Sequence, residues 1–131
     1  MIVVDTCAIL WDALDSAKLS LKAKSALDEG SESRTLLISD ISLWEIAMLI
    51  KKKRVEIDET PANFLRLVLS SRNYQRVGIC PEISGLSVNL DDRINGDPAD
   101  RLIVATALFR QAPLVTADRN LISAGIVETI W

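Results

Sequence analysis

The sequence predicts an α/β fold built on a parallel β-sheet with helices on both faces. Short apolar runs of the kind that form buried strands alternate along the chain with longer stretches that show helical spacing. Because neighbouring parallel strands need a crossover helix between them, this alternation favours a parallel sheet. The length of 131 residues fits one core, so we expect a single domain over residues 1–131.

Strand and helix signals alternate from the start of the chain. Residues 2–4 form an apolar run that ends at an acid, which predicts a buried strand, and a short helix is expected over 8–14. Ser20 is a helix-capping residue and Gly30 is typical of a helix end, so a second helix is expected between them. Residues 35–39 are predicted to form the second strand.

The middle of the chain is predicted to add three helices and a strand. Residues 40–52 repeat apolar positions at helical spacing. Thr60 followed by Pro61 is typical of a helix start and opens another amphipathic stretch. Residues 77–80 are predicted to form the third strand, and 81–89 a short helix.

The last third of the chain combines a buried helix with two strands. Pro98 suits the first turn of a helix, and the uncharged run 102–109 indicates that this helix is buried on more than one side. The β-branched run 113–118 predicts a fourth strand that ends at an acid. A turn around Leu121 then leads to a final strand over 126–130.

Composition excludes several kinds of chemistry. The chain contains no histidine, which rules out Ser-His-Asp and Cys-His nucleophiles and His-based nucleases. Cys7 and Cys80 lie near predicted strand ends, where we expect small buried thiols rather than a disulfide. Any catalysis must therefore use carboxylates, hydroxyls, lysine or a bound metal ion.

The chain is expected to be soluble and cytoplasmic. No uncharged run approaches the roughly 18 residues of a membrane span, and the N-terminus reaches an acid at residue 5 without the basic start of a signal peptide. The net charge of −3 argues against a protein that coats nucleic acid. It does not argue against a nuclease whose acids gather around a metal ion.

Four acids are predicted to meet at one edge of the sheet. Asp5 ends the first strand and Asp118 ends the fourth, while Glu45 and Asp100 lie in the early turns of two helices. Right-handed crossovers bring such positions to the same edge. Gathered carboxylates repel unless a cation neutralises them, and an oxygen-rich pocket without histidine or thiolate ligands suits Mg²⁺ or Mn²⁺.

Each acid also has an alternative structural role. Asp5 and Asp118 are typical helix caps, and Glu45 stands three residues after Ser42 as in a capping box. Asp97 is the expected cap of the helix that begins at Pro98. Taken singly these roles are common, and only the predicted convergence of the acids favours a functional site.

Four stretches of the chain resemble the successive motifs of PIN-domain proteins, in particular the VapC-type toxins of type II toxin–antitoxin pairs. They are VVDTCAILW, SDISLWEIAMLIKKKR, NGDPADRLIVATA and PLVTADRN. The resemblance spans nearly the whole chain. It implies a three-layer α/β/α sandwich with a parallel five-stranded sheet and a metal-dependent endoribonuclease that inhibits translation.

The resemblance also implies site residues, carried over position by position. The acids that hold Mg²⁺ or Mn²⁺ would be Asp5, Glu45, Asp100 and Asp118. The hydroxyls of Thr6 and Thr116 would lie beside the ligands, with Asp97 as a weaker acid. The residues proposed to hold RNA phosphates are Lys51, Lys52, Lys53, Arg54, Arg101 and Arg119. The alternative for the basic run is the solvated last turn of a helix.

Two kinds of partner are implied as well. These are a second copy of the chain, in a homodimer, and a VapB-type antitoxin whose C-terminal segment would cover the site. Trp11, Leu14, Trp44 and Met48 would form an apolar surface if their face were exposed, although core packing is the expectation for Trp44.

Three positions differ from the family pattern. Cys7 stands where a polar residue such as serine is frequent, Asn95 replaces a histidine, and Asn120 replaces an aspartate. Two other functions are also considered. A binding module would keep the fold without cutting RNA, and a phosphoaspartyl phosphatase would need a second aspartate at position 7, where this chain has cysteine.

Overall fold

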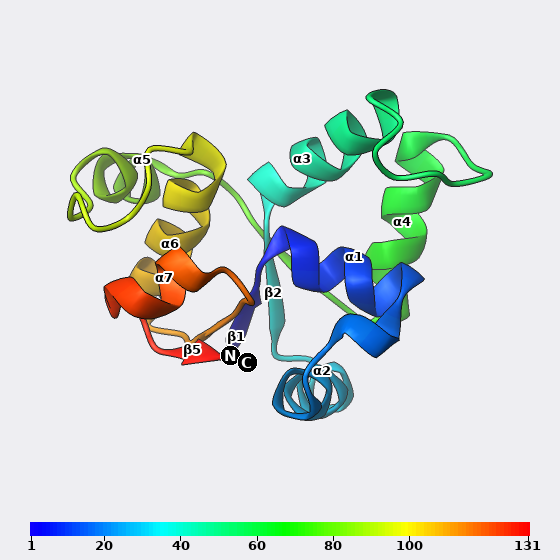
Figure 1. The fold of residues 1–131 in the computed structure, drawn as a ribbon, viewed down its shortest axis with the longest axis horizontal. Coiled ribbons are helices and arrows are strands. Elements are labelled where there is room, and N and C mark those ends of the chain that lie inside the picture. The colour runs from blue at the N-terminus through cyan, green and yellow to red at the C-terminus, as the bar shows by residue number, and fades with distance from the viewer.

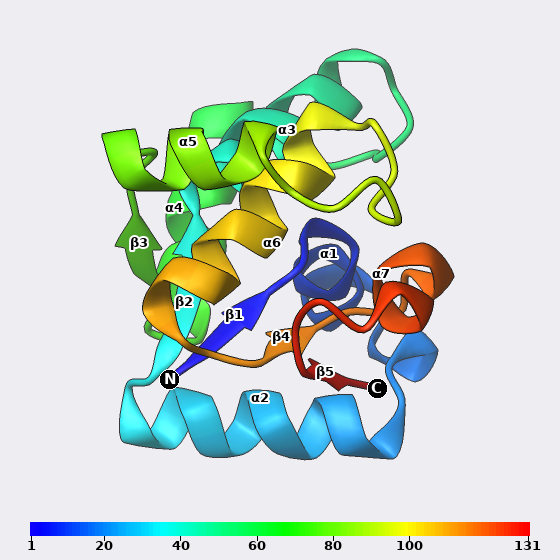
Figure 2. The same ribbon diagram turned by 90° about the vertical axis from the view of Figure 1, so that its left-hand side faces the viewer.

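The computed structural model describes residues 1–131 and contains one parallel sheet of five strands in the order β3-β2-β1-β4-β5. The chain moves outward from β1 to β3, then returns to the other side of β1, so the strand order reverses between β1 and β4. Figure 2 shows the strands in this order. The strands are β1 (Ile2–Val4), β2 (Leu36–Ser39), β3 (Gln75–Val77), β4 (Leu114–Val115) and β5 (Thr129–Ile130).

Helices cover both faces of the sheet, which confirms the predicted three-layer α/β/α architecture. In Figure 1, α5, α6 and α7 lie on one face, and α1, α2 and α4 lie on the other. The helices are α1 (Thr6–Leu14), α2 (Leu21–Ser33), α3 (Asp40–Lys51), α4 (Pro61–Ser71), α5 (Pro81–Val88), α6 (Pro98–Arg110) and α7 (Arg119–Ala124), with a 3₁₀ turn at Ser16–Lys18. None of these helices has the length and apolar character needed to cross a membrane.

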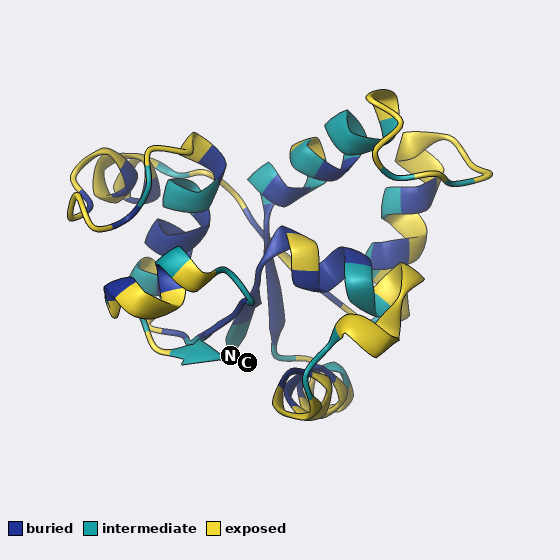
Figure 3. Cartoon of the chain, viewed as in Figure 1, coloured by how far each residue is buried: buried dark blue, intermediate teal, exposed yellow.

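Successive residues of the central strands point into two separate cores, as strand geometry requires. Val3 and Leu37 pack in the core under α5, α6 and α7, whereas Val4 and Ile38 pack in the core under α1, α2 and α4. All four side chains are fully buried. Figure 3 shows the central strands as buried over most of their length, so the polar residues that follow them emerge from the core of the molecule.

The structure differs from the sequence prediction at Gly30, which does not end α2. The helix continues to Ser33, and Arg34 ends it in the left-handed region with φ 57°. A Cβ atom added at Gly30 would lie 2.3 Å from Cδ2 of Leu36, so this glycine lets the helix approach β2 closely. The prediction was wrong because a glycine needed for packing has the same sequence signal as a glycine that ends a helix.

Three strands differ from their predicted bounds by more than one residue. The fourth strand covers only Leu114–Val115 instead of 113–118. The third strand is Gln75–Val77 rather than 77–80, because the chain leaves the sheet at Gly78 on its way to α5. The last strand is limited to Thr129–Ile130, since only these residues pair with β4.

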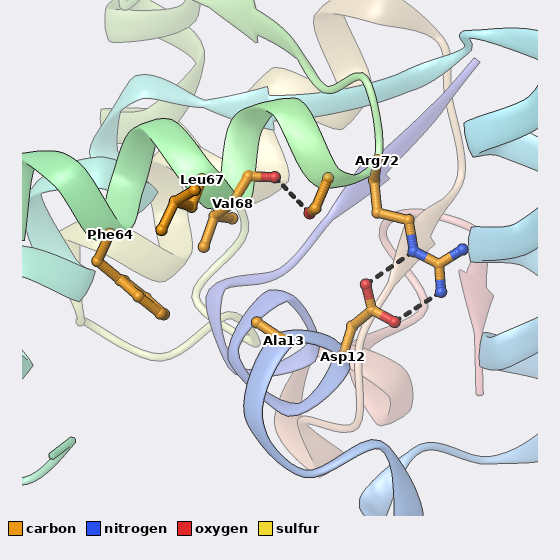
Figure 4. A pocket seen from close by; sticks show the side chains of 7 residues that line it. Asp12, Ala13, Phe64, Leu67, Val68 and Arg72 are labelled. Atoms are coloured by element: carbon orange, nitrogen blue, oxygen red, sulfur yellow. Dashed lines mark hydrogen bonds and ion pairs between the residues drawn. The ribbon is translucent and has the colours of Figure 1, made fainter. Parts of the chain in front are cut away.

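An arginine joins the helices on one face of the sheet. Arg72, at the end of α4, binds both carboxylate oxygens of Asp12 on α1, at 2.9 Å from Nε and 2.7 Å from Nη2 (Figure 4). Its Nη1 donates to Asp28 on α2 at 2.7 Å. Beside this ion pair lies a pocket of about 330 Å³ between α1 and α4, to which Phe64 and Leu67 contribute.

Candidate metal and catalytic site

The structure brings the four predicted acids to the carboxyl edge of the sheet. Asp5 follows β1 and caps α1, while Asp118 follows β4 and caps α7. Glu45 lies in the second turn of α3 and Asp100 in the first turn of α6. The strand order reverses between β1 and β4, which is where open α/β sheets bind their ligands.

The acids of this edge influence each other electrostatically. Burial raises the pKa of Asp100 to about 6, and repulsion from Asp5, Asp97 and Asp118 adds to the effect, while a hydrogen bond from Asn95 opposes it. Asp5 is 6% exposed. Burial raises its pKa too, as does repulsion from Asp118 and Asp97, against hydrogen bonds from Thr116 and Thr6.

Glu45 belongs to the same electrostatic group. Burial raises the pKa of its carboxyl, a hydrogen bond from Thr6 opposes the shift, and repulsion from Asp5 and Asp97 adds to it. Each of these shifts favours the protonated acid, so the ionised cluster is costly in the folded protein.

Cys7 lies beside the same group of acids. Partial desolvation raises the pKa of its thiol to about 11, followed by repulsion from the carboxylates of Asp5, Glu45, Asp100 and Asp118. All four acids therefore act on one sulfur atom. The residue is exposed, contrary to the expectation of a buried thiol, because it lies on the side of α1 that faces this edge of the sheet.

Two threonine hydroxyls fix the orientation of the acids. The Thr116 hydroxyl donates to Oδ2 of Asp5 at 2.7 Å, and the backbone N–H of Thr6 donates to Oδ1 of Asp5 at 2.8 Å. The Thr6 hydroxyl donates to Oε1 of Glu45 at 2.6 Å and lies 2.9 Å from Oγ of Ser42. The two threonines suggested by the resemblance therefore each contact an acid.

Capping and clustering occur together at this site. Asp97 caps α6 through N–H donation from Ala99 and Asp100, and Oδ1 of Asp118 accepts from two N–H groups at the start of α7. For Glu45 the structural alternative is wrong. Ser39, not Ser42, caps α3, so Glu45 has no capping partner.

Two asparagines belong to the site. The sequence identifies them only as differences from the family pattern. Nδ2 of Asn95 donates to Oδ2 of Asp100 at 3.0 Å and to Oδ1 of Asn120 at 3.0 Å. Asn95 opens the motif NGDPAD and Asn120 lies two residues after Asp118, and these positions were the available signal. No local rule says that residues 25 positions apart are bonded to each other.

The basic residues predicted to bind RNA differ in their surroundings. Lys51 to Arg54 are all exposed at the end of α3 and make no ion pair, and Arg119 is exposed at the start of α7. Arg101 instead donates to the backbone carbonyl groups of Ser87, Leu90, Ile94 and Asn95. Its guanidinium therefore holds the loop between α5 and α6.

The donor set fits a hard divalent cation. No lysine or arginine forms a salt bridge with any of the four acids. Oε2 of Glu45, Oδ1 of Asp100 and Oδ2 of Asp118 accept no hydrogen bond from the protein. The side chains as they stand do not bring three acidic or thiol groups into position around one ion. Binding would therefore need side-chain rotation or bridging water, and Mg²⁺ commonly keeps several waters.

Comparison with known proteins agrees with this architecture. The sequence profile of the PIN domain matches residues 2–126. Ribonuclease VapC22 of Mycobacterium tuberculosis is 32% identical over 120 residues, which cover 92% of this chain and 88% of that protein.

Solved structures share the fold at lower identity. The toxin–antitoxin complex VapBC2 of Rickettsia felis, bound to a DNA fragment from its promoter, superposes with a TM-score of 0.74 at 18% identity over 98% of this chain and 97% of that one. VapC20 of Mycobacterium tuberculosis, described as a toxin that cleaves the sarcin-ricin loop, gives 0.67 at 19% identity over 98% of both chains. The profile match and the 32% identical relative show that this chain belongs to the PIN-domain family, as a protein of the VapC type.

Proposed function

We propose that residues 1–131 act as one nuclease domain, an endoribonuclease that hydrolyses RNA phosphodiester bonds with Mg²⁺ or Mn²⁺. The observation that carries the proposal is the convergence of Asp5, Glu45, Asp100 and Asp118 without a basic partner. The relative VapC22 is named a ribonuclease, which supports the same activity. We further propose that the chain is the toxin of a toxin–antitoxin pair acting in the cytoplasm.

Asp5 and Asp100 would be the main ligands of the ion, with Glu45 and Asp118 holding it directly or through water. When bound, a divalent cation neutralises charge on the phosphate and lowers the pKa of a coordinated water. The chain's own contribution is to fix the ligands. Thr116 and Thr6 hold Asp5 and Glu45 in one orientation each, at 2.7 and 2.6 Å.

Two carboxylates, those of Glu45 and Asp118, could take part in the hydrolytic step by accepting a proton. A water oxygen would form a bond to phosphorus while the in-line P–O ester bond breaks. The water would lose one proton to a carboxylate, and the leaving oxygen would take up a proton from solvent. Glu45 presents an unbonded Oε2 and Asp118 an unbonded Oδ2, which can orient the water and accept its proton. Both oxygens lie on side chains whose other oxygen is fixed by a hydrogen bond.

Exposed basic residues would hold the flanking phosphates. Lys51 to Arg54 and Arg119 meet this need because they are exposed and have no ion pair. Arg101 is left out of this role because its donors are taken by backbone carbonyl groups. Phosphate contacts of this kind add affinity without selecting sequence.

A homodimer and a VapB-type antitoxin are proposed as partners. Trp44 is 58% exposed and Leu14 is 48% exposed, so the expectation that Trp44 lies in the core was wrong and both side chains are available for contact. Trp11, by contrast, packs against Trp131 with ring centroids 5.6 Å apart. The VapBC2 complex of Rickettsia felis and a toxin–antitoxin complex of Klebsiella pneumoniae share this fold, which supports an antitoxin partner.

Cleavage of defined RNA with and without Mn²⁺ tests the proposal. The wild-type protein should cut only with the ion, and the 5′ ends produced should map to fixed positions. An Asp5→Asn protein, purified in parallel, should leave the same RNA intact. Cleavage that persists in chelator, or in the Asp5→Asn protein, would contradict a metal-assisted mechanism. The phosphatase alternative predicts phosphate release from a monoester, and position 7 carries a thiol instead of the acid it needs.

A further inference from the structure

We propose that Asn95 and Asn120 form a neutral amide bridge that positions Asp100 relative to Asp118, making both asparagines positioning residues of the metal site. The inference rests on the proposed function, because it assigns a role at the same site. Its basis is an unbroken path of hydrogen bonds between two acids that repel each other.

The path starts at the loop after β4. Oδ1 of Asp118 accepts from the backbone N–H of Asn120 at 2.8 Å, which places the Asn120 side chain toward the neighbouring loop. Oδ1 of Asn120 then accepts from the backbone N–H of Asn95 at 2.9 Å and from its Nδ2 at 3.0 Å. The second hydrogen of that Nδ2 group reaches Oδ2 of Asp100 at 3.0 Å.

The orientation of each amide is determined by its other contacts. Oδ1 of Asn95 accepts from the backbone N–H of Asp97 at 2.9 Å, so its Nδ2 must face Asp100. Nδ2 of Asn120 donates to the carbonyl of Arg93 at 2.8 Å, so its Oδ1 must face Asn95. Exchanging oxygen and nitrogen in either amide would bring like partners together.

The loop that carries Asn95 is held from a second side. Arg101 of α6 donates to the carbonyl groups of Leu90 at 2.8 Å and Ile94 at 3.1 Å. Because Arg101 directly follows Asp100, the loop is fixed to the same helix turn that carries the acid. Asn95 therefore has little freedom to withdraw its donor.

The chemistry of the bridge explains why amides suit it. An amide donates an N–H to Asp100 without adding charge to a group of acids that already repel. One oxygen of Asp100 is then held while Oδ1 remains free for an ion. Groups that orient metal ligands in this way typically contribute about 10- to 100-fold to metal affinity.

The test measures Mn²⁺ affinity directly, by calorimetric titration of the metal-free protein. Asn95→Ala and Asn120→Ala should each weaken binding by about tenfold. The double variant should be no weaker than Asn95→Ala, because both changes break the same path. Asn89→Ala is the matched control, since Asn89 is exposed just after α5 and its side chain makes no hydrogen bond; its affinity should equal that of the wild type.

A cleavage assay separates positioning from a folding defect. In both variants the Mn²⁺ concentration for half-maximal cleavage should rise about tenfold, while the rate at saturating Mn²⁺ stays within about threefold of wild type. If the wild type binds Mn²⁺ and both single variants bind it with the same affinity as the wild type, the bridge is overturned. Additive losses of affinity in the double variant would overturn it too. Both results would leave the proposed function standing. No Mn²⁺ binding by the wild type would overturn both.

Discussion

Helix α1 carries two aspartates in opposite electrostatic situations. Asp12, in the last turns of α1, receives two hydrogen bonds from Arg72, and Asp28 of α2 shares the same guanidinium. Asp5, at the start of α1, receives only a hydroxyl and an amide and faces other acids. The chain supplies a cation beside Asp12 and none beside Asp5. Asp12 and Asp28 are neutralised by the chain itself, whereas Asp5 lies among acids that no lysine or arginine pairs.

The pKa shifts express this difference. The hydrogen bonds that Arg72 donates to Asp12 raise the pKa of Arg72 further above its usual range. Burial partly opposes this shift, and the hydrogen bond to Asp28 adds to it. Burial raises the pKa of Asp5 and Asp100 instead. Ionisation therefore stabilises the Arg72 cluster and destabilises the acidic site.

Removing one acid should have the largest effect, and on activity rather than stability. Asp100→Asn should lower RNA cleavage at least about a hundredfold, because a direct ligand matters at least as much as the groups around it. Urea unfolding of the metal-free variant should show stability equal to or above wild type, since one repelling charge is gone. A variant that is inactive because it is markedly less stable would favour a capping role.

Removing the arginine should reverse that pattern. Arg72→Ala should destabilise the protein by about 3 kcal/mol, because Asp12 is left without a partner in a site where its side chain is 11% exposed. Cleavage per folded molecule should stay at the wild-type level. Arg66→Ala is the control, since this exposed arginine of α4 bonds only Asn63. A loss above about 0.5 kcal/mol there would show that the helix, not the ion pair, is responsible.

Mn²⁺ should substitute for the missing cation at the acidic site. At a hundredfold excess over its dissociation constant, the ion should stabilise the fold by about 2.7 kcal/mol. Arg72→Ala should gain the same increment from a lower starting point, and Asp5→Asn should gain far less. Thermal unfolding scans at graded Mn²⁺, reversed with chelator, measure this. Equal gains in wild type and Asp5→Asn would place the ion elsewhere.

The pH dependence of stability should give the smallest effect. Asp100 has a pKa of about 6 in the folded protein against 3.8 ordinarily, so the folded state binds more protons between these values. Metal-free stability should therefore fall as pH rises from about 4 to 6. Asp100 should contribute about 1 kcal/mol, less than the full shift implies, because water screens its half-buried carboxylate. Asp100→Asn should flatten the curve in this window, and an unchanged slope would assign it to other groups.

Local sequence rules captured the features that depend on neighbouring residues. The order of strands and helices followed from apolar periodicity, and the edge on which Asp5 and Asp118 lie followed from the handedness of crossovers. The order of the strands within the sheet depends on which runs pair, and periodicity does not encode this.

The same rules do not predict features that depend on contacts between residues distant in the sequence. The sequence predicts a helix end at Gly30 because it does not reveal the close approach of this residue to Leu36. The sequence predicts an RNA contact for Arg101 because it does not reveal that backbone carbonyl groups surround the guanidinium. The bond between Asn95 and Asn120 joins two loops that only the folded sheet brings together. The convergence of the acids was predictable, as was the place of Thr6 and Thr116 beside them. The contacts of Asn95 and Asn120 were not.

Calorimetric titration of Mn²⁺ into the metal-free wild-type protein tests the central claim most directly, with Asp5→Asn and Asp12→Asn measured alongside. The wild-type and Asp12→Asn proteins should bind Mn²⁺ with the same affinity, and Asp5→Asn should bind it at least about tenfold more weakly. Undetectable binding to the wild type, or equal affinity in all three proteins, would contradict a cation site made of the unpaired acids.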